Sequence, residues 1–108
     1  MDAGWVVVGD QRLRAVDGRA PGSGAAWFVY VLQSTTLNRT YVGIARDPLA
    51  RQSQHNGVTA GGARSTRSGR PWELRRVFGP YDSRSTASQA EYRLKKRRGA
   101  ARWQGDAP

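Results

Sequence analysis

Five residues of this chain have side chains suited to hydrolytic chemistry, at spacings that could bring them together. Tyr30 and Tyr41 lie eleven residues apart on two strand-like runs, and Arg51 and His55, four apart on an expected helix, share one face. Glu91 flanks the apolar face of a second expected helix. Each residue alone fits an ordinary role, as a core tyrosine, a surface histidine or a solvated charge. Together they could bind a phosphate and a cation and move a proton.

The residue types that are missing narrow this chemistry. The 108 residues include no cysteine and one histidine. Disulfides, thiol nucleophiles, iron–sulfur clusters and cysteine-type zinc sites are therefore excluded from the chain, and so is a histidine-rich metal cage. Any metal ion in the chemistry must be a hard cation held by oxygen ligands.

The charge of the chain favours a polyanionic partner. The net charge is +10, and residues 1–26 add nothing to it because three arginines there balance three aspartates. Sixteen of the eighteen basic residues are arginines, whose guanidinium groups can hold a phosphate through two hydrogen bonds at once. This distribution indicates nucleic acid as the partner. The alternative explanation is an arginine-rich surface that reflects a GC-rich genome.

Three short runs of aromatic and β-branched residues predict the strands that carry the two tyrosines. They cover residues 27–32, 41–44 and 72–78, and Gly79-Pro80 is expected to end the third. The first run is apolar throughout, which predicts a strand buried on both faces. We expect a small three-stranded antiparallel sheet.

Two helices are expected to flank this sheet. Asp47-Pro48 supplies an N-cap and a first-turn proline for a helix that ends at Gly57. The stretch 59–70 has no apolar period, so a loop is predicted there. The second helix begins at Ser85-Thr86, with a capping box between Thr86 and Gln89, and continues into the basic run before Gly99. The fold class is therefore α/β, in the order β-β-α-loop-β-α.

Both ends of the chain are expected to lie outside this unit. Residues 5–8 and 12–16 predict an extra N-terminal hairpin or arm that turns at Gly9-Asp10, and 17–24 have the composition of a linker. The predicted division is therefore an arm and linker at 1–26, a domain at 27–98 and a tail at 99–108, frayed unless Trp103 docks. No run is apolar and long enough for a membrane span or a signal peptide, so we expect a cytoplasmic, non-secreted protein.

Five blocks of sequence, in a fixed order, resemble a known family. They are Phe28-Val29-Tyr30; Tyr41-Val42-Gly43-Ile44; the helix with Asp47, Arg51 and Gln54-His55-Asn56; Gly62-Ala63-Arg64-Ser65-Thr66 with Arg70-Pro71-Trp72-Glu73-Leu74; and Glu91-Tyr92-Arg93-Leu94-Lys95-Lys96. The pattern resembles the GIY-YIG nuclease family, above all the catalytic domain of the Slx-type structure-specific endonucleases, which cut branched DNA. The last block instead resembles small stand-alone bacterial members. The resemblance covers residues 27–98.

The resemblance implies an endonuclease that depends on Mg²⁺ or Mn²⁺ and cuts branched or flapped DNA in repair or recombination. Glu91 would be the one protein ligand of the ion. Arg51 would neutralise charge on the phosphoryl oxygens, while Tyr41 would help to deprotonate or orient the attacking water, with support from Tyr30. His55 would be a second candidate base or a phosphate donor.

The same resemblance implies where DNA would bind. Gly43 would let a phosphate approach the backbone closely. Contacts to the DNA backbone are expected from Arg64, Thr66, Arg67, Arg70, Lys95 and Lys96. The zinc domain of Slx-type subunits cannot form in a chain without cysteine, and the sequence identifies no protein partner. Two alternatives stay open, a non-catalytic nucleic-acid-binding module of this fold and a nuclease for single strands or RNA.

Overall fold

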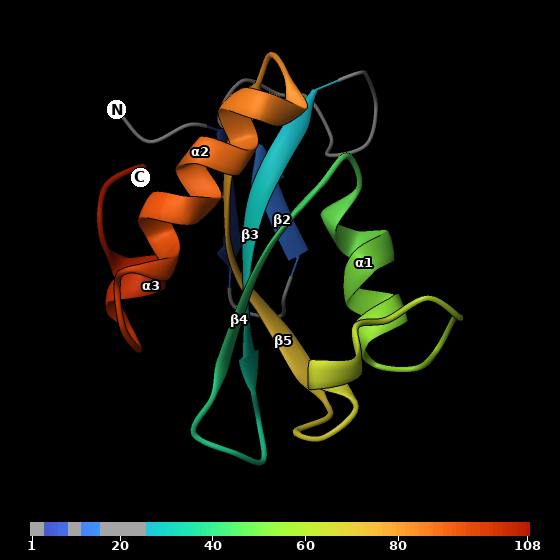
Figure 1. Cartoon of the computed structure of the whole chain (residues 1–108). Coiled ribbons are helices and arrows are strands. Elements are labelled where there is room, and N and C mark those ends of the chain that lie inside the picture. The colour runs from blue at the N-terminus through green and yellow to red at the C-terminus, as the bar shows by residue number, and fades with distance from the viewer. Residues whose placement is uncertain (1–3, 9–11, 16–25) are drawn as a thin grey trace.

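The computed structural model describes residues 4–8, 12–15 and 26–108. Its elements in chain order are β1 (Gly4–Val8), β2 (Arg12–Ala15), β3 (Trp27–Ser34), β4 (Thr40–Ala45), α1 (Pro48–His55), the 3₁₀ turn η1 (Arg64–Thr66), β5 (Trp72–Tyr81), α2 (Arg84–Lys95) and α3 (Ala101–Gln104) (Figure 1). The predicted order of strands and helices from residue 27 to residue 98 is confirmed. The expected turn at Gly9-Asp10 and the linker-like stretch 17–24 lie outside the described residues.

One antiparallel sheet runs through the molecule in the order β2-β1-β5-β3-β4. β5, β3 and β4 are the three predicted strands. The predicted N-terminal hairpin is present as well, but it extends the sheet, because β1 pairs with β5 from Gly4↔Phe78 to Val6↔Arg76. The edge of β5 would otherwise present unpaired backbone groups, which a further strand can satisfy.

Strand β5 continues through Gly79-Pro80, so the expectation that this pair ends the strand is wrong. Among the described residues the pairing with β1 stops at Phe78, and beyond it β5 pairs with β3 alone. Pro80 lies between the Val29↔Phe78 and Trp27↔Tyr81 pairs, where proline is tolerated because a bulge leaves an unpaired residue. The β3–β5 register also shifts between Trp27 and Val29, so a bulge absorbs the irregular backbone.

A helix packs on each face of the sheet, and the alternation of β3 divides the core between them (Figure 1). On the α1 side the buried residues are Phe28, Tyr30, Leu32, Ala45, Trp72, Leu74 and Val77. On the α2 side they are Val29, Val31, Val42, Phe78, Ala87, Ala90 and Leu94. The predicted burial of the first strand on both faces and the predicted apolar face of the second helix are both confirmed.

The two helices differ in how well their first residues were predicted. Asp47 caps α1 as expected, since its carboxylate accepts a hydrogen bond from the Ala50 backbone N–H at 3.1 Å. The cap of α2 is Ser83, whose hydroxyl accepts from the Thr86 N–H at 3.1 Å. The helix thus begins before the expected Thr86–Gln89 capping box, because the Ser83 hydroxyl already satisfies the backbone N–H of Thr86.

The C-terminal tail is helical and docked. α3 places Trp103 against the α2 side of the core, and the Trp103 carbonyl accepts from the Arg76 guanidinium at 2.8 Å. Arg102 donates to the Thr40 hydroxyl at 2.7 Å, which ties the tail to β4. The expected alternative in which Trp103 docks is therefore the observed one.

None of the helices in the described residues is long and apolar enough to cross a membrane.

Candidate active site

Tyr30 lies in β3 and is positioned by the strand opposite. Its register partner on β4 is Gly43, where an added Cβ atom would lie 2.5 Å from the Tyr30 hydroxyl oxygen and 2.7 Å from its Cζ. A residue with a side chain at this position would displace the phenol, so glycine is required. The close approach that was expected of a phosphate at Gly43 is thus made by the Tyr30 ring.

His55 is buried beneath Tyr30 at the end of α1, with no exposed surface. Its Nε2 lies 2.8 Å from the Tyr30 hydroxyl, and its Nδ1 lies 2.8 Å from the Thr66 hydroxyl. Burial, and then the charges of Arg51 and Arg70, lower the pKa of His55 from 6.5 to about 4. The imidazole is therefore neutral at pH 7 and has no free nitrogen to offer a phosphate, so the expected role as a phosphate donor does not fit its position.

Tyr41 completes the aromatic part of the site and is the more accessible tyrosine. It is half-buried, with its ring centroid 4.5 Å from that of His55 and 6.2 Å from that of Tyr30. The two tyrosines and the histidine form one packed group, as their spacing predicted. Within that group, Tyr41 is the residue that a water molecule from solvent can reach.

Arg51 lies one turn before His55 on the same face of α1, as predicted. Its guanidinium donates to the side-chain oxygen of Gln54 and to the Gly61 carbonyl at 2.9 Å, and its positive charge lies close enough to Tyr30 to act on the pKa of that phenol. These contacts hold the guanidinium end of the Arg51 side chain against α1 and the loop that follows it. The arginine is thus oriented before any substrate arrives, which is the condition for stabilising a developing charge efficiently.

The electrostatics of the site keep the Tyr30 proton in place. Burial raises the pKa of the Tyr30 phenol above its ordinary value of 10, and the nearby Arg51 guanidinium only partly opposes this. The negative charge of Glu91 is close enough to raise the pKa of Tyr30 further. Tyr30 is therefore a neutral hydroxyl at pH 7 and not a base, which suits the supporting role expected of it.

Glu91 reaches the site from the other helix. It follows the buried Ala90 on α2, and its side chain is 22% exposed and lies 3.7 Å from the Lys95 ammonium group. That lysine is more than half exposed and flexible, so it does not block the carboxylate. Within the described part of the chain no three histidine, aspartate or glutamate residues form a metal-binding group. A cation here would have Glu91 as its carboxylate ligand.

The loop after α1 has a buried residue and an exposed basic rim. Thr66 is fully buried, where it contacts His55 and accepts the Trp72 indole N–H on its backbone carbonyl at 2.9 Å. Its expected contact with DNA does not fit that position. Arg64, Arg67 and Arg70 remain exposed around it. The short turn η1 accounts for this division, because it points one side chain inward and its neighbours outward.

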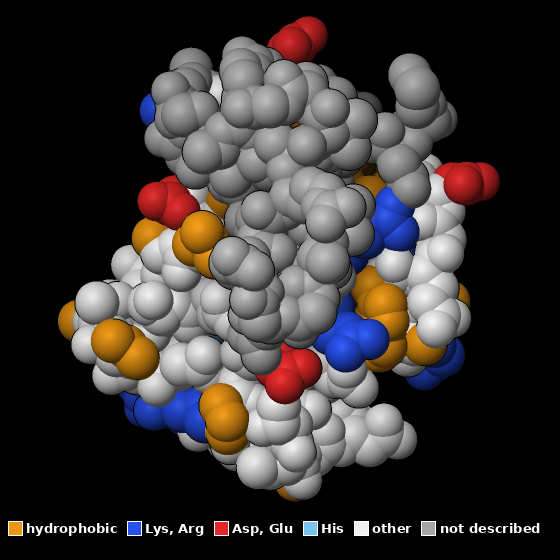
Figure 2. Space-filling view, turned by 180° about the vertical axis from the view of Figure 1, so that it is seen from behind, with side chains coloured by type: hydrophobic (Ala, Val, Ile, Leu, Met, Phe, Trp, Pro, Cys, Tyr) orange, Lys and Arg blue, Asp and Glu red, His pale blue; other side chains and the backbone are white. Residues whose placement is uncertain are grey.

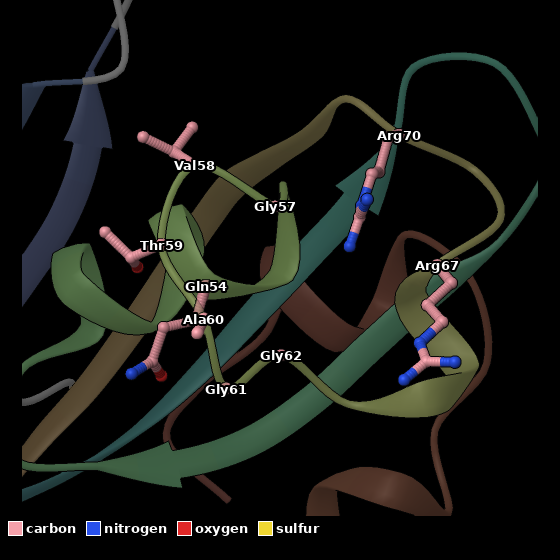
Figure 3. A pocket seen from close by; sticks show the side chains of 9 residues that line it. All are labelled: Gln54, Gly57, Val58, Thr59, Ala60, Gly61, Gly62, Arg67 and Arg70. Carbon is pink, nitrogen blue, oxygen red and sulfur yellow. The ribbon is translucent and has the colours of Figure 1, made fainter.

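A polar pocket of about 370 Å³ lies beside Arg51, lined by Gln54, Gly57–Gly62, Arg67 and Arg70. Figure 3 shows Arg67 and Arg70 on one side of it and Gln54 with residues 59–61 on the other. Arg70 donates from Nε to the His55 carbonyl at 2.8 Å, and a Cβ atom on Gly57 would meet its Nη1 at 2.6 Å. Arg70, which is one of the predicted DNA contacts, is therefore held against the backbone of His55.

Lys95 and Lys96 are both exposed at the end of α2. The Lys96 ammonium lies 4.5 Å from the centroid of the exposed Tyr92 ring, within range for a cation–π contact. Their positions leave both charges on the surface, on the α2 side of the site.

Two residues that position the site had no role assigned from the sequence. Asn56 accepts from the Trp72 N–H at 2.6 Å and donates to the Trp72 carbonyl at 3.0 Å, which fastens β5 to the end of α1. Ser34 donates to the Gly69 carbonyl at 2.6 Å and accepts from the Leu37 N–H at 2.8 Å, which fastens the loop to the β3–β4 turn. Two signals pointed to Asn56, its place in the helix block of the resemblance and the preference of asparagine for helix ends over the helix interior.

Several proteins named structure-specific endonuclease subunit SLX1 are similar to this chain. The one from Cryptococcus neoformans is 41% identical over 70 residues, which cover 62% of this chain and 14% of that protein. The one from Chaetomium globosum is 40% identical over 73 residues, covering 65% and 22%. The one from Malassezia globosa is 40% identical over 68 residues, covering 62% and 15%. The chain spans less than a quarter of the length of these curated relatives.

The family model described as the GIY-YIG catalytic domain matches residues 26–104. The matched stretch runs from the start of β3 to the end of α3, so it extends beyond the predicted 27–98 and contains every residue of the site described above. The order of the blocks, the sheet with a helix on each face and this match agree. The chain belongs to the GIY-YIG family.

Proposed function

We propose that this protein is an endonuclease that hydrolyses phosphodiester bonds in branched or flapped DNA. The observation that carries the proposal is the convergence of Arg51, the Tyr30–His55 pair and Glu91 from both faces of the sheet. A guanidinium fixed in advance, a water-accessible tyrosine and a carboxylate are the groups that phosphate hydrolysis needs. The names of the similar SLX1 proteins support DNA branches as the substrate.

In this proposal each face of the sheet has its own task. Arg51 holds the scissile phosphate and stabilises the charge that develops on its oxygens. Tyr41 orients the attacking water and helps to remove its proton, while Tyr30 and His55 hold the Tyr41 ring in place through packing. Arg51 comes from α1 and Glu91 from α2, so in this proposal the phosphate would be held by one residue of each helix.

The donor set at Glu91 fits a magnesium or manganese ion. Mg²⁺ keeps several waters and is commonly held by one or two carboxylates together with substrate phosphates, so one partly exposed carboxylate suffices. The ion would polarise the phosphate and stabilise the leaving oxygen. Glu91 would hold it, and the other ligands would be water and phosphate oxygens.

DNA would lie across β4, between the loop on one side and the end of α2 on the other. Arg64, Arg67 and Arg70 are exposed on the first side, Lys95 and Lys96 on the second. The face seen from behind is partly visible in Figure 2. In the part of it that the grey atoms leave visible, basic side chains are interspersed with acidic and hydrophobic ones (Figure 2).

The test is cleavage by the full chain of a matched panel of one sequence, made as duplex, flap, four-way junction, single strand and RNA. Each substrate is incubated with Mg²⁺, with Mn²⁺ and with a chelator. We expect metal-dependent cuts near the branch in flap or junction DNA. Cutting of single strands or RNA alone would favour the second enzyme hypothesis, and binding without cutting would favour a non-catalytic module.

Two arginine variants separate the site from the general charge of the protein. Arg51→Ala should abolish cutting and weaken binding modestly, because one phosphate contact is lost. Arg46→Ala is the matched control, since Arg46 is exposed and lies over the Trp27 ring, 5.0 Å from its centroid. Equal cutting by the two variants would contradict the proposed role of Arg51.

A further inference from the structure

A chain of hydrogen bonds runs inward from the site through three buried side chains. The Tyr30 hydroxyl contacts His55 Nε2 at 2.8 Å, His55 Nδ1 contacts the Thr66 hydroxyl at 2.8 Å, and that hydroxyl contacts the Ala63 carbonyl at 2.9 Å. Tyr30 is 1% exposed and the other two side chains are fully buried. Water therefore cannot substitute for any member, and each proton in the chain has a definite place.

The inner end of the chain fixes the proton of His55. A threonine hydroxyl has one proton, and here it is directed to the Ala63 carbonyl, which can only accept. The Thr66 oxygen must then accept the hydrogen bond from His55, so the imidazole proton is on Nδ1. Because a neutral imidazole has one N–H, Nε2 is left as an acceptor.

The outer end of the chain is compatible with the same arrangement. The nearby Arg51 guanidinium is a donor without acceptor capacity, so it offers the phenol proton no acceptor. The phenol proton is then free to point to the nearest acceptor, which is His55 Nε2. The contacts of Thr66, His55 and Tyr30 thus give one direction for all the hydrogen bonds of the chain.

We propose that Thr66 is a positioning residue that holds His55 in its Nδ1-protonated tautomer and thereby directs the Tyr30 O–H into the protein. The oxygen of Tyr30 then faces Arg51 only as an acceptor. The guanidinium, which its contacts with Gln54 and Gly61 hold in place, thus lies near an oxygen whose proton points away from it. A residue buried in the loop thus sets the direction of the Tyr30 O–H through His55.

The location of Thr66 links this orientation to the surface of the loop. Thr66 ends the turn η1, between the exposed Arg64 and Arg67. A contact that moves this turn also moves the group that sets the tautomer. This link rests on the proposed function, in which DNA touches these arginines, whereas the tautomer itself follows from the contacts inside the protein.

The tautomer can be measured without any substrate. His55 is the only histidine of the chain, so a long-range ¹H–¹⁵N correlation spectrum of the full-length protein at pH 7 reports this ring alone. We expect the pattern of an Nδ1-protonated neutral imidazole in the parent protein and in Thr66→Ser, which keeps the hydroxyl. Thr66→Val keeps the size but removes the acceptor, and the proton should move to Nε2, where the Tyr30 oxygen can accept it.

Tyr30→Phe tests which neighbour sets the tautomer. If Thr66 does, the proton stays on Nδ1 after the phenol oxygen is removed. An Nε2 proton in the parent protein, an unchanged tautomer in Thr66→Val, or a switched tautomer in Tyr30→Phe would each overturn the proposal. Should Thr66→Val not fold, the spectra of the parent protein, Thr66→Ser and Tyr30→Phe still decide it.

The consequence for cleavage is tested separately, because it depends on the proposed function. Thr66→Val should cut flap DNA at least tenfold more slowly than the parent protein, and Thr66→Ser should recover most of that loss. Parallel circular dichroism melts show whether the two variants are equally folded at the assay temperature. An Nδ1 tautomer in a protein that cuts nothing would refute the endonuclease and leave the tautomer standing, whereas the reverse result would refute the tautomer alone.

Discussion

On the α1 face of the sheet the polar groups of the site are hydrogen-bonded to one another. On the α2 face, by contrast, a single carboxylate lies at the edge of the apolar contact between α2 and the sheet. Tyr30, His55 and Thr66 are buried and satisfy each other's hydrogen bonds. Glu91 is partly exposed and is held in place by its helix, through the burial of Ala90 and Leu94. The first arrangement is a structural unit as well as a functional one; the second supplies a charge that the fold does not need.

This difference indicates how the two faces respond to mutation. Removing one member of a buried hydrogen-bond chain leaves its neighbour unsatisfied, so stability and activity should fall together. Removing the Glu91 carboxylate leaves no buried group without a partner, so activity should fall without a loss of stability. The measurements below test this separation, beginning with the largest effect.

Glu91→Gln should cause the largest loss of activity with the smallest loss of stability. The amide keeps the shape but not the charge, so the cation should no longer bind and flap cleavage in Mg²⁺ should fall by about 10³-fold, equivalent to about 4 kcal/mol. DNA binding should hold or tighten, since a negative charge near the phosphates is gone. Cleavage rates, a binding titration and a thermal melt together check all three expectations.

Glu73→Gln is the matched control, because Glu73 is the other glutamate of the chain and pairs with Arg75 at 3.9 Å on the surface. It should cut at close to the parental rate. Near-parental cutting by Glu91→Gln would refute the metal-ligand role, and a large drop in its melting temperature would refute the separation of the two faces.

The stability of the protein should depend on pH through His55 on the α1 face. The groups that face this imidazole are Arg51 from α1, Arg70 from the loop, and the Tyr30 and Tyr41 rings from β3 and β4. The pKa of His55 is lowered to about 4, so between pH 6.5 and 4 the unfolded chain binds a proton that the folded chain does not. The free energy of unfolding should therefore fall as the pH falls through this range, by about 3 kcal/mol in total.

Urea unfolding at several pH values between 4.5 and 7 measures this slope. A His55→Gln variant should be less stable at pH 7, because its neighbours lose their partner, but its stability should change much less over the same range. A parental slope that matches the slope of the variant would show that His55 is not a buried neutral group in solution.

Gly43→Ala should disturb the α1 face from the neighbouring strand. The added carbon would lie 2.5 Å from the Tyr30 hydroxyl oxygen, so the phenol must move and its bond to His55 must lengthen. Crowding of this kind typically costs about 1–3 kcal/mol of stability. Chemical unfolding measures the loss, and the cleavage rate should fall with it.

Gly105→Ala serves as the comparison for Gly43→Ala. Its added carbon would meet the end of the flexible Arg97 side chain at 2.9 Å, which can move aside. Little change in stability is expected there. An equally small effect of Gly43→Ala would mean that the Tyr30 phenol does not lie across β4.

The sequence alone predicted the parts of the molecule that depend on local signals. Asp47 and Pro48 fixed the start of α1, and the spacing of Arg51 and His55 placed both on one face. The apolar positions of α2 put Glu91 beside a buried face. In each case the deciding interaction lies within one helical turn, where propensity and periodicity apply.

Features that depend on distant partners could not be predicted in this way. The requirement for glycine at position 43 comes from Tyr30 on the facing strand, and the burial of Thr66 in a polar loop comes from His55 on α1. Pro80 is tolerated inside β5 because it lies where the register between β3 and β5 shifts. Each of these is a matter of register or packing across the fold, and a polar, glycine-rich stretch carries no periodic signal that reveals it.

The smallest predicted effect concerns which face of the sheet the DNA follows. Arg67 and Lys96 lie on opposite sides of β4, and both should contact phosphates if the strand to be cut passes between Arg51 and Glu91. Changing either one to glutamine should then reduce the slope of log affinity against log salt by about 0.9 on duplex DNA. Arg84→Gln is the control, because Arg84 lies about 18 Å from Lys96 along α2, over the Trp27 ring. If only Arg67→Gln reduced the slope, the DNA would contact the α1 face alone. Glu91 would then have to reach the phosphate from outside the region that the DNA covers.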